Sequence, residues 1–184
     1  MPDERVKLTY DDYAALPDDG RRYQVLDGEL VVTPSPSLRH QDIVFNLGKI
    51  LDRHVRDRSL GKVYMSPVDC LLGPWTVLGP DVVFVETARF DRLTHRAIEG
   101  APTLVIEVLS PSTAVIDRKR KRALYAEHGV PHYWIVDPDA LALDALVLAG
   151  DDYGVPVRLE GPDAEGSLEP FPDLVVALRD VFAE

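Results

Sequence analysis

The sequence contains very little cysteine and no long apolar segment. Its single cysteine, Cys70, cannot form a disulfide within the chain or supply a thiolate metal site. The apolar stretch VDCLL around it indicates a small buried hydrophobic residue. No run approaches the roughly 20 apolar residues of a membrane-spanning helix, and the opening stretch MPDERVKLTYDDY lacks the apolar centre of a signal peptide. We therefore expect a cytoplasmic protein without membrane contact or redox chemistry.

Basic residues are also scarce, with 20 lysines and arginines against 31 acidic residues and a formal net charge of -11. Because phosphate contacts depend on clustered basic residues, this balance weighs against a nucleic-acid partner. The acidity is concentrated near the C-terminus, where residues 137–184 hold 12 acids and 2 bases. Residues 30–136 hold 11 acids and 14 bases and are mildly basic. DNA binding is therefore not excluded.

The elements follow from residue spacing and turn residues. No repeat or linker divides the chain, so we expect a single domain over residues 1–184. Thr9 as a cap predicts a short helix that ends at about Pro17. An Asp-Gly turn between apolar flanks predicts a hairpin over 23–33. Helical spacing of apolar residues predicts a long helix over 37–58. Apolar runs predict strands over 62–73, 80–86, 103–109 and 132–138, with a loop over 89–102.

A second helix joins the last two of these strands. It is expected to begin at Ser112 or Thr113 and to close at Gly129, a glycine C-cap before Pro131. A helix that joins two apolar strands is typical of a βαβ crossover, so these strands are predicted to be parallel and covered on both faces.

One carboxylate lies in the middle of an apolar strand. In LVIEVL, Val105, Glu107 and Leu109 share one face of the strand, because side chains alternate with a period of two. A buried carboxylate is unfavourable unless it is paired, protonated or bound to a metal. Asp81 stands at the edge of the apolar run PDVVFV. Two carboxylates on adjacent strands suit a hard divalent cation such as Mg²⁺.

The crossover helix offers a cation for the same site. Asp117, Lys121 and Tyr125 recur every four residues and share one face, whereas Lys119 lies roughly opposite. Lys121 is therefore the better candidate.

Each of these residues also has a structural interpretation. Asp81 could cap a turn, Asp117 and Lys121 could form an exposed helix pair, and most of the basic run 118–122 could be solvated. His40 could cap or pack the long helix or contact phosphate. Asp69 could be a third acid of the pocket or a turn residue.

Taken together, these motifs resemble the Uma2 family of restriction endonucleases, within the PD-(D/E)XK nuclease superfamily. The resemblance rests on PDVVFV, on LVIEVLSPST, on Asp117 with Lys121, on YAEHGVPHYWIVDP and on the N-terminal stretch YQVLDGELVVTPSPSLRHQ. It implies an α/β fold with a restriction-endonuclease-like core. A mixed central sheet would be flanked by helices, with an N-terminal hairpin and a C-terminal β extension through LVLAG and VPVRLE.

The same resemblance implies a metal-dependent endonuclease that hydrolyses DNA, and a homodimer. Asp81 and Glu107 would be its two acids and Lys121 its lysine. With the backbone carbonyl of Val108, the acids would hold Mg²⁺ or Mn²⁺.

Two departures from the family pattern leave an alternative open. The usual lysine position two residues after the second acid is occupied by Leu109, so the lysine would come from the next helix. Gln24 stands where family members often carry an acid, so that carboxylate is missing or supplied by Glu29. The alternative function is a catalytically silent nuclease-like module that binds nucleic acid or a protein.

Overall fold

The computed structural model describes residues 6–183 and has a mixed α/β architecture. Its largest sheet has the order β11-β10-β9-β8-β6-β3, with β12 beside β10. Strands β8 and β9 are parallel, as the crossover predicted, and the other pairs of this sheet are antiparallel. The strand bounds are β3 Gly61–Met65, β6 Val82–Glu86, β8 Leu104–Val108, β9 His132–Asp137, β10 Ala142–Ala149, β11 Asp152–Tyr153 and β12 Val157–Glu160.

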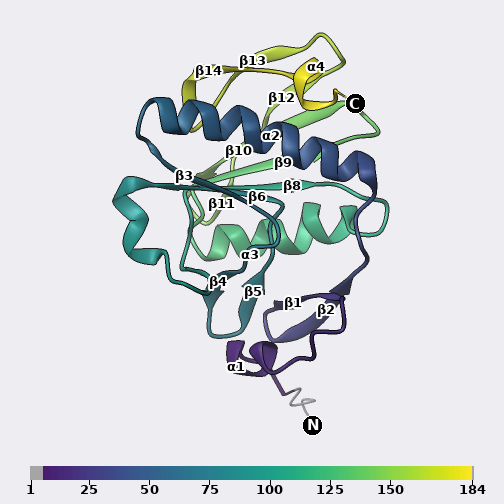
Figure 1. The fold of residues 1–184 in the computed structure, drawn as a ribbon, viewed down its shortest axis with the longest axis vertical. Coiled ribbons are helices and arrows are strands. Elements are labelled where there is room, and N and C mark those ends of the chain that lie inside the picture. Colours follow the sequence, from purple (N-terminus) through teal and green to yellow (C-terminus); the bar gives the residue numbers. More distant parts are fainter. Residues whose placement is uncertain (1–5, 184) are drawn as a thin grey trace.

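Helices cover both faces of this sheet (Figure 1). On one face lies α2 (Leu38–Asp57), which begins where the Ser37 side chain accepts a hydrogen bond from the His40 backbone N–H. On the other face lie a π-helical turn, η2 (Ile116–Lys121), and α3 (Arg122–Glu127). The predicted crossover helix therefore exists, although its middle is π-helical. It ends as expected at Gly129, which has a φ of 73°.

A second sheet lies on the α3 side of the central sheet, below it in Figure 1, and shares a buried apolar cluster with α3 and the central sheet. Its order is β2-β1-β5-β4-β7, and the predicted hairpin forms its β1 and β2. The short predicted helix, α1 (Tyr10–Ala14), is capped by Thr9 and lies beside this sheet. The strand bounds are β1 Arg22–Leu26, β2 Glu29–Thr33, β4 Cys70–Gly73, β5 Thr76–Leu78 and β7 Ile98–Glu99.

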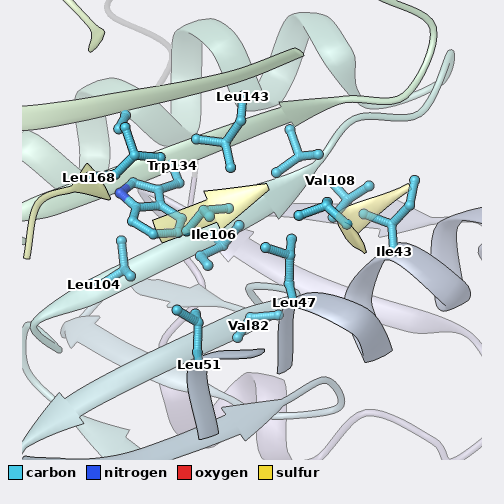
Figure 2. Packing of buried hydrophobic residues seen from close by; sticks show 14 of the residues in the cluster. Ile43, Leu47, Leu51, Val82, Leu104, Ile106, Val108, Trp134, Leu143 and Leu168 are labelled. Atoms are coloured by element: carbon cyan, nitrogen blue, oxygen red, sulfur yellow. The ribbon is translucent and has the colours of Figure 1, made fainter. Parts of the chain in front are cut away.

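The hydrophobic core has two parts, one on each face of the central sheet. On the α2 side, Leu104, Ile106 and Val108 pack against Leu47 and Leu51 of α2 (Figure 2). A hairpin of β13 (Glu165–Leu168) and β14 (Phe171–Ala177), followed by α4 (Leu178–Val181), extends this cluster. On the α3 side, the cluster includes Val105 and Leu109, so side chains alternate along β8 as predicted.

Three parts of the fold differ from the prediction. The run 62–73 is not one strand, because Pro67, which has no N–H for a ladder, separates β3 from β4 and these belong to different sheets. The expected loop 89–102 contains the end of a 3₁₀ helix, η1 (Thr87–Arg92), and β7. The central sheet extends beyond the four predicted strands, with β10 and β12 supplying the expected C-terminal β extension.

Within residues 6–183, no helix has the length and apolar character required to span a membrane.

Candidate active site

Asp81 and Glu107 lie on the same face of the central sheet. The antiparallel register pairs Val82 with Ile106 and Val83 with Val105, so one step further Asp81 stands opposite Glu107. The Asp81 backbone N–H donates to the Ile106 carbonyl at 3.1 Å, which continues the pairing. Residues directly opposite on antiparallel strands have Cβ atoms about 5 Å apart. The predicted juxtaposition of the two acids is therefore present, with both side chains almost completely buried.

Lys121 reaches these acids from the π-helical turn. Its Nζ donates a hydrogen bond to Oε2 of Glu107 at 2.9 Å. It also forms an ion pair with Oδ1 of Asp117 at 3.0 Å, without the geometry of a hydrogen bond. Lys121 is 4 % exposed, whereas Lys119 is exposed to solvent. The assignment of Lys121 over Lys119 as the inward-pointing lysine is confirmed.

The π-helical turn is the local feature that the sequence did not predict. The Arg122 backbone N–H donates to the Asp117 carbonyl five residues earlier, and the Tyr133 hydroxyl donates to the same carbonyl at 3.0 Å. Such turns are rare and often occur at functional sites. Here the turn contains both Asp117 and Lys121, so it orients two of the buried charges of the pocket.

Both carboxylate oxygens of Glu107 accept hydrogen bonds. Oε2 accepts from Lys121, and Oε1 accepts from the Tyr125 hydroxyl at 2.7 Å. Burial raises the pKa of Glu107 to about 8, against the opposing charge of Lys121 and with further repulsion from Asp117 and Asp81. Above that pKa the two donors face a carboxylate, and below it Glu107 carries a proton.

The electrostatic balance of the site is negative. Burial disfavours the ammonium of Lys121, but attraction to Glu107 and Asp117 outweighs burial and raises its pKa. Asp81, Glu107 and Asp117 are 4 %, 2 % and 1 % exposed, so three buried acids face one buried lysine.

His40 enters the site from α2. Its Nε2 lies 3.1 Å from the Val108 carbonyl oxygen and 3.3 Å from Oδ2 of Asp81, while the Val108 backbone N–H donates to the same Oδ2 at 2.9 Å. Since Nε2 faces two acceptors, we assign its proton there. Among the described residues Nδ1 has no hydrogen-bond partner. The His40 side chain therefore contacts the site, while the capping bond uses its backbone.

These residues line one pocket of about 230 Å³. Its rim is formed by residues 33–37 and 110–113, and Asp81, Glu107, Val108, Lys121 and His40 lie in its wall. Gln24 also lines it, with Oε1 accepting from the Gly79 backbone N–H at 3.0 Å.

Two of the auxiliary candidates lie elsewhere. The Glu29 carboxylate is mostly exposed and pairs with Arg120 at 2.8 Å, because the tight Asp27-Gly28 turn places it at the start of β2. It does not replace the acid that is absent at Gln24. Asp69 accepts a hydrogen bond from the Tyr13 hydroxyl at 2.9 Å and lines a different pocket. Neither residue lines the pocket of Asp81 and Glu107.

The donor set of the pocket fits a hard divalent cation. Among residues 6–183, no group of three or more His, Cys, Asp and Glu side chains is close enough to hold a metal unaided. Magnesium, however, usually binds one or two carboxylates and completes its shell with water and phosphate oxygens. Asp81, Glu107 and the Val108 carbonyl offer such oxygens, and the excess of buried negative charge favours a cation.

One pocket residue gave no signal in the sequence analysis. Arg22, the first residue of β1, lines the pocket near Gln24. It stands in a mixed stretch of charged residues before a hairpin, and nothing in that stretch distinguishes a pocket arginine from a solvated one.

Comparison with known proteins gives a consistent result. The model of the Uma2 family, with the description "Putative restriction endonuclease", matches residues 10–179. "Uncharacterized protein sll1609" of Synechocystis sp. (strain ATCC 27184 / PCC 6803 / Kazusa) is 26 % identical over 145 residues, which are 77 % of this chain and 81 % of that protein.

A solved structure shares the fold. It is the crystal structure of "a putative nuclease belonging to DUF820" from Anabaena variabilis ATCC 29413, with a TM-score of 0.79. The match covers 96 % of this chain and 98 % of the other, at 20 % sequence identity. At that identity the likeness establishes the fold and leaves the chemistry to be argued from the pocket.

Proposed function

Because the chain belongs to the Uma2 family, we propose that it is a metal-dependent endonuclease that hydrolyses DNA phosphodiester bonds. The observation that carries the proposal is the pocket in which Asp81 stands opposite Glu107 and Lys121 pairs with Glu107 and Asp117. We assign the central sheet with its flanking helices to the restriction-endonuclease-like core of the PD-(D/E)XK nucleases.

Asp81, Glu107 and the backbone carbonyl of Val108 would hold Mg²⁺ or Mn²⁺. When bound, the cation supplies Lewis acidity, which polarises a phosphate oxygen and lowers the pKa of water. The protein supplies the oxygen donors in a buried pocket, where charge interactions are stronger than in water.

Lys121 would orient the attacking water or stabilise the charge that develops on phosphate. Its contacts with Glu107 and Asp117 hold the ammonium beside the acids, so little reorganisation is needed when substrate binds. These contacts weigh against the catalytically silent alternative, which drew support from the shift of the lysine onto the helix.

His40 would act as a positioning residue. The Nε2–H lies between the Val108 carbonyl and Asp81 Oδ2, two of the oxygens assigned to the cation. By holding both groups from α2, it would fix their orientation before substrate arrives.

The direct test is a DNA cleavage assay with Mg²⁺ or Mn²⁺. We expect weak, salt-sensitive cleavage with little sequence preference, because the mildly basic region 30–136 can attract phosphate but offers no obvious base-reading helix. Glu107→Gln should reduce the rate by about 10²-fold or more, since removing one charge-stabilising group has effects of that order. Lys121→Ala should reduce the rate while leaving metal binding largely intact.

Glu127→Gln is the matched control, because Glu127 is exposed on α3 and lies outside the pocket. It should cleave like the wild type. Cleavage by Glu107→Gln at the wild-type rate would contradict the proposal. Absence of cleavage by the wild type with either metal would favour the catalytically silent module.

A further inference from the structure

A second pocket adjoins the first. Its volume is about 310 Å³, and it lies between α1, the start of β1 and residues 67–69. Arg22, Gln24 and Gly79 line both pockets, so the two cavities share a wall. Arg22 therefore lies at the boundary between the two pockets.

Arg22 has no side-chain hydrogen bond or ion pair among the described residues. Other arginines near the crossover helix are paired, as Arg118 is with Asp137 and Arg120 with Glu29, both at 2.8 Å. A guanidinium is always charged at physiological pH and presents a planar set of donors that matches phosphate. The position of an unpaired arginine between two pockets suits a phosphate group there.

The second pocket has a lining unlike that of the first. Tyr13 and Tyr23 line it, together with Arg21 and Asp69. The Tyr13 hydroxyl is fixed by its hydrogen bond to Asp69, and the Tyr23 hydroxyl donates to Asp19 at 2.8 Å. Aromatic side chains beside basic ones are typical of sites where bases of single-stranded nucleic acid stack, with little dependence on sequence.

We propose that the adjoining pockets bind successive nucleotides of an unpaired nucleic-acid strand and that Arg22 contacts the phosphate between them. The proposal rests on the proposed function, since the phosphate in the first pocket would be the one hydrolysed. It adds a substrate class, unpaired nucleic acid, and a substrate-binding residue.

Burial of the catalytic groups favours an unpaired strand over a duplex. Glu107 and Lys121 are 2 % and 4 % exposed and lie below the rim formed by 33–37 and 110–113. Duplex DNA has a persistence length of about 150 base pairs, so the distortion that would bring one of its phosphates into such a pocket is costly. An unpaired strand is flexible and can place one phosphate there. The net charge of -11 also disfavours binding of a duplex, because its second strand adds another negatively charged phosphate backbone.

The test measures binding without hydrolysis. Fluorescence anisotropy in EDTA would compare a labelled oligothymidylate with a labelled hairpin duplex of the same number of nucleotides. We expect the wild type to bind the single strand more tightly. Arg22→Gln should weaken that binding about tenfold or more, as expected for loss of a charge-assisted hydrogen bond. It should also reduce the slope of log K against log salt by about 0.7.

Arg56→Gln is the matched control, because Arg56 is exposed on α2, pairs with Asp52 and lies outside both pockets. It should leave binding and its salt dependence close to those of the wild type. Arg22→Lys keeps the charge but loses the planar donors, so it should bind with intermediate affinity. Thermal melting of each variant checks that the fold is retained.

Equal or tighter binding of the hairpin duplex would overturn the proposal. So would wild-type affinity in Arg22→Gln, or absence of single-strand binding by the wild type. Because the measurement excludes divalent metal, it is independent of cleavage. If the protein binds the single strand through Arg22 but does not cleave DNA with Mg²⁺ or Mn²⁺, the proposed hydrolysis is refuted. The proposal that the two adjoining pockets bind an unpaired strand is then retained.

Discussion

The two faces of strand β8 differ in chemistry although they belong to the same five residues. The face toward α2 carries Leu104, Ile106 and Val108, which pack within an apolar cluster (Figure 2). The face toward α3 carries Val105 and Glu107, and Glu107 meets Lys121, Tyr125 and the acids of the pocket. The side chains of β8 on the first face are all apolar, whereas on the second face Glu107 places buried charge within an apolar cluster.

This difference separates stability from function. Burial of apolar area stabilises the fold on the α2 side. Buried ion pairs are weak contributors to stability, because desolvation offsets much of their attraction. On the α3 side three acids face one lysine, so the arrangement is poor for stability and suited to binding a cation. We infer that the α2 side holds the sheet in place for the chemistry of the α3 side.

The largest effect on stability is expected on the α2 side. Leu47 is completely buried against β8, so Leu47→Ala should lower the free energy of unfolding by about 2–5 kcal/mol through lost burial and a cavity. Urea denaturation measures this change. Leu38→Ala is the control, since Leu38 is 85 % exposed on the same helix and should change stability by less than about 0.5 kcal/mol. Similar losses in both variants would contradict the assigned core.

On the α3 side, the effect of a substitution should depend on pH. The pKa of Glu107 is raised to about 8 in the fold, above its ordinary value of 4.5. The folded protein therefore holds a proton that the unfolded chain releases, and this contribution to stability is present below about pH 4.5 and is lost as the pH rises to about 8. Glu107→Gln should remove that loss.

Thermal melting at pH 5 and pH 8 in EDTA tests this expectation. Relative to the wild type, Glu107→Gln should gain about 1 kcal/mol or more between the two pH values, since each pKa unit corresponds to that order of energy. Glu127→Gln, on the surface of α3, should follow the wild type. Parallel profiles for the wild type and Glu107→Gln would show that burial does not perturb this acid.

Much of the site followed from residue periodicity. The alternation along β8 placed Glu107 on the face opposite Ile106, and helical spacing selected Lys121 over Lys119. Both predictions depend on local geometry, which adjacent residues determine. The hairpin around Asp27-Gly28 is local in the same sense, since φ is positive at both turn residues.

The features that were missed depend on distant contacts. The division of 62–73 between two sheets depends on the pairing of β3 with β6 and of β4 with β5 and β7, although Pro67 marks the break in the sequence. The β13–β14 hairpin completes the cluster on α2, and the role of Arg22 depends on two pockets that meet at its side chain. Pro67 is a local signal for the first of these features, and the other two have no spacing signal in the sequence. The single domain over 1–184, the cytoplasmic location and the homodimer stay predictions.

The most direct test of the account is whether a divalent cation binds between the acids of the α3 side. A ligand that binds only the folded state raises its melting temperature, by an amount equivalent to about 2.7 kcal/mol at a hundred times the dissociation constant. The melting temperature of the wild type should therefore rise with Mn²⁺ concentration. Asp81→Asn and Glu107→Gln should show much smaller rises, and Asp180→Asn, which changes an exposed acid of α4, should match the wild type. Equal rises in all four proteins, or no rise in the wild type, would contradict the assignment of this pocket as a cation site.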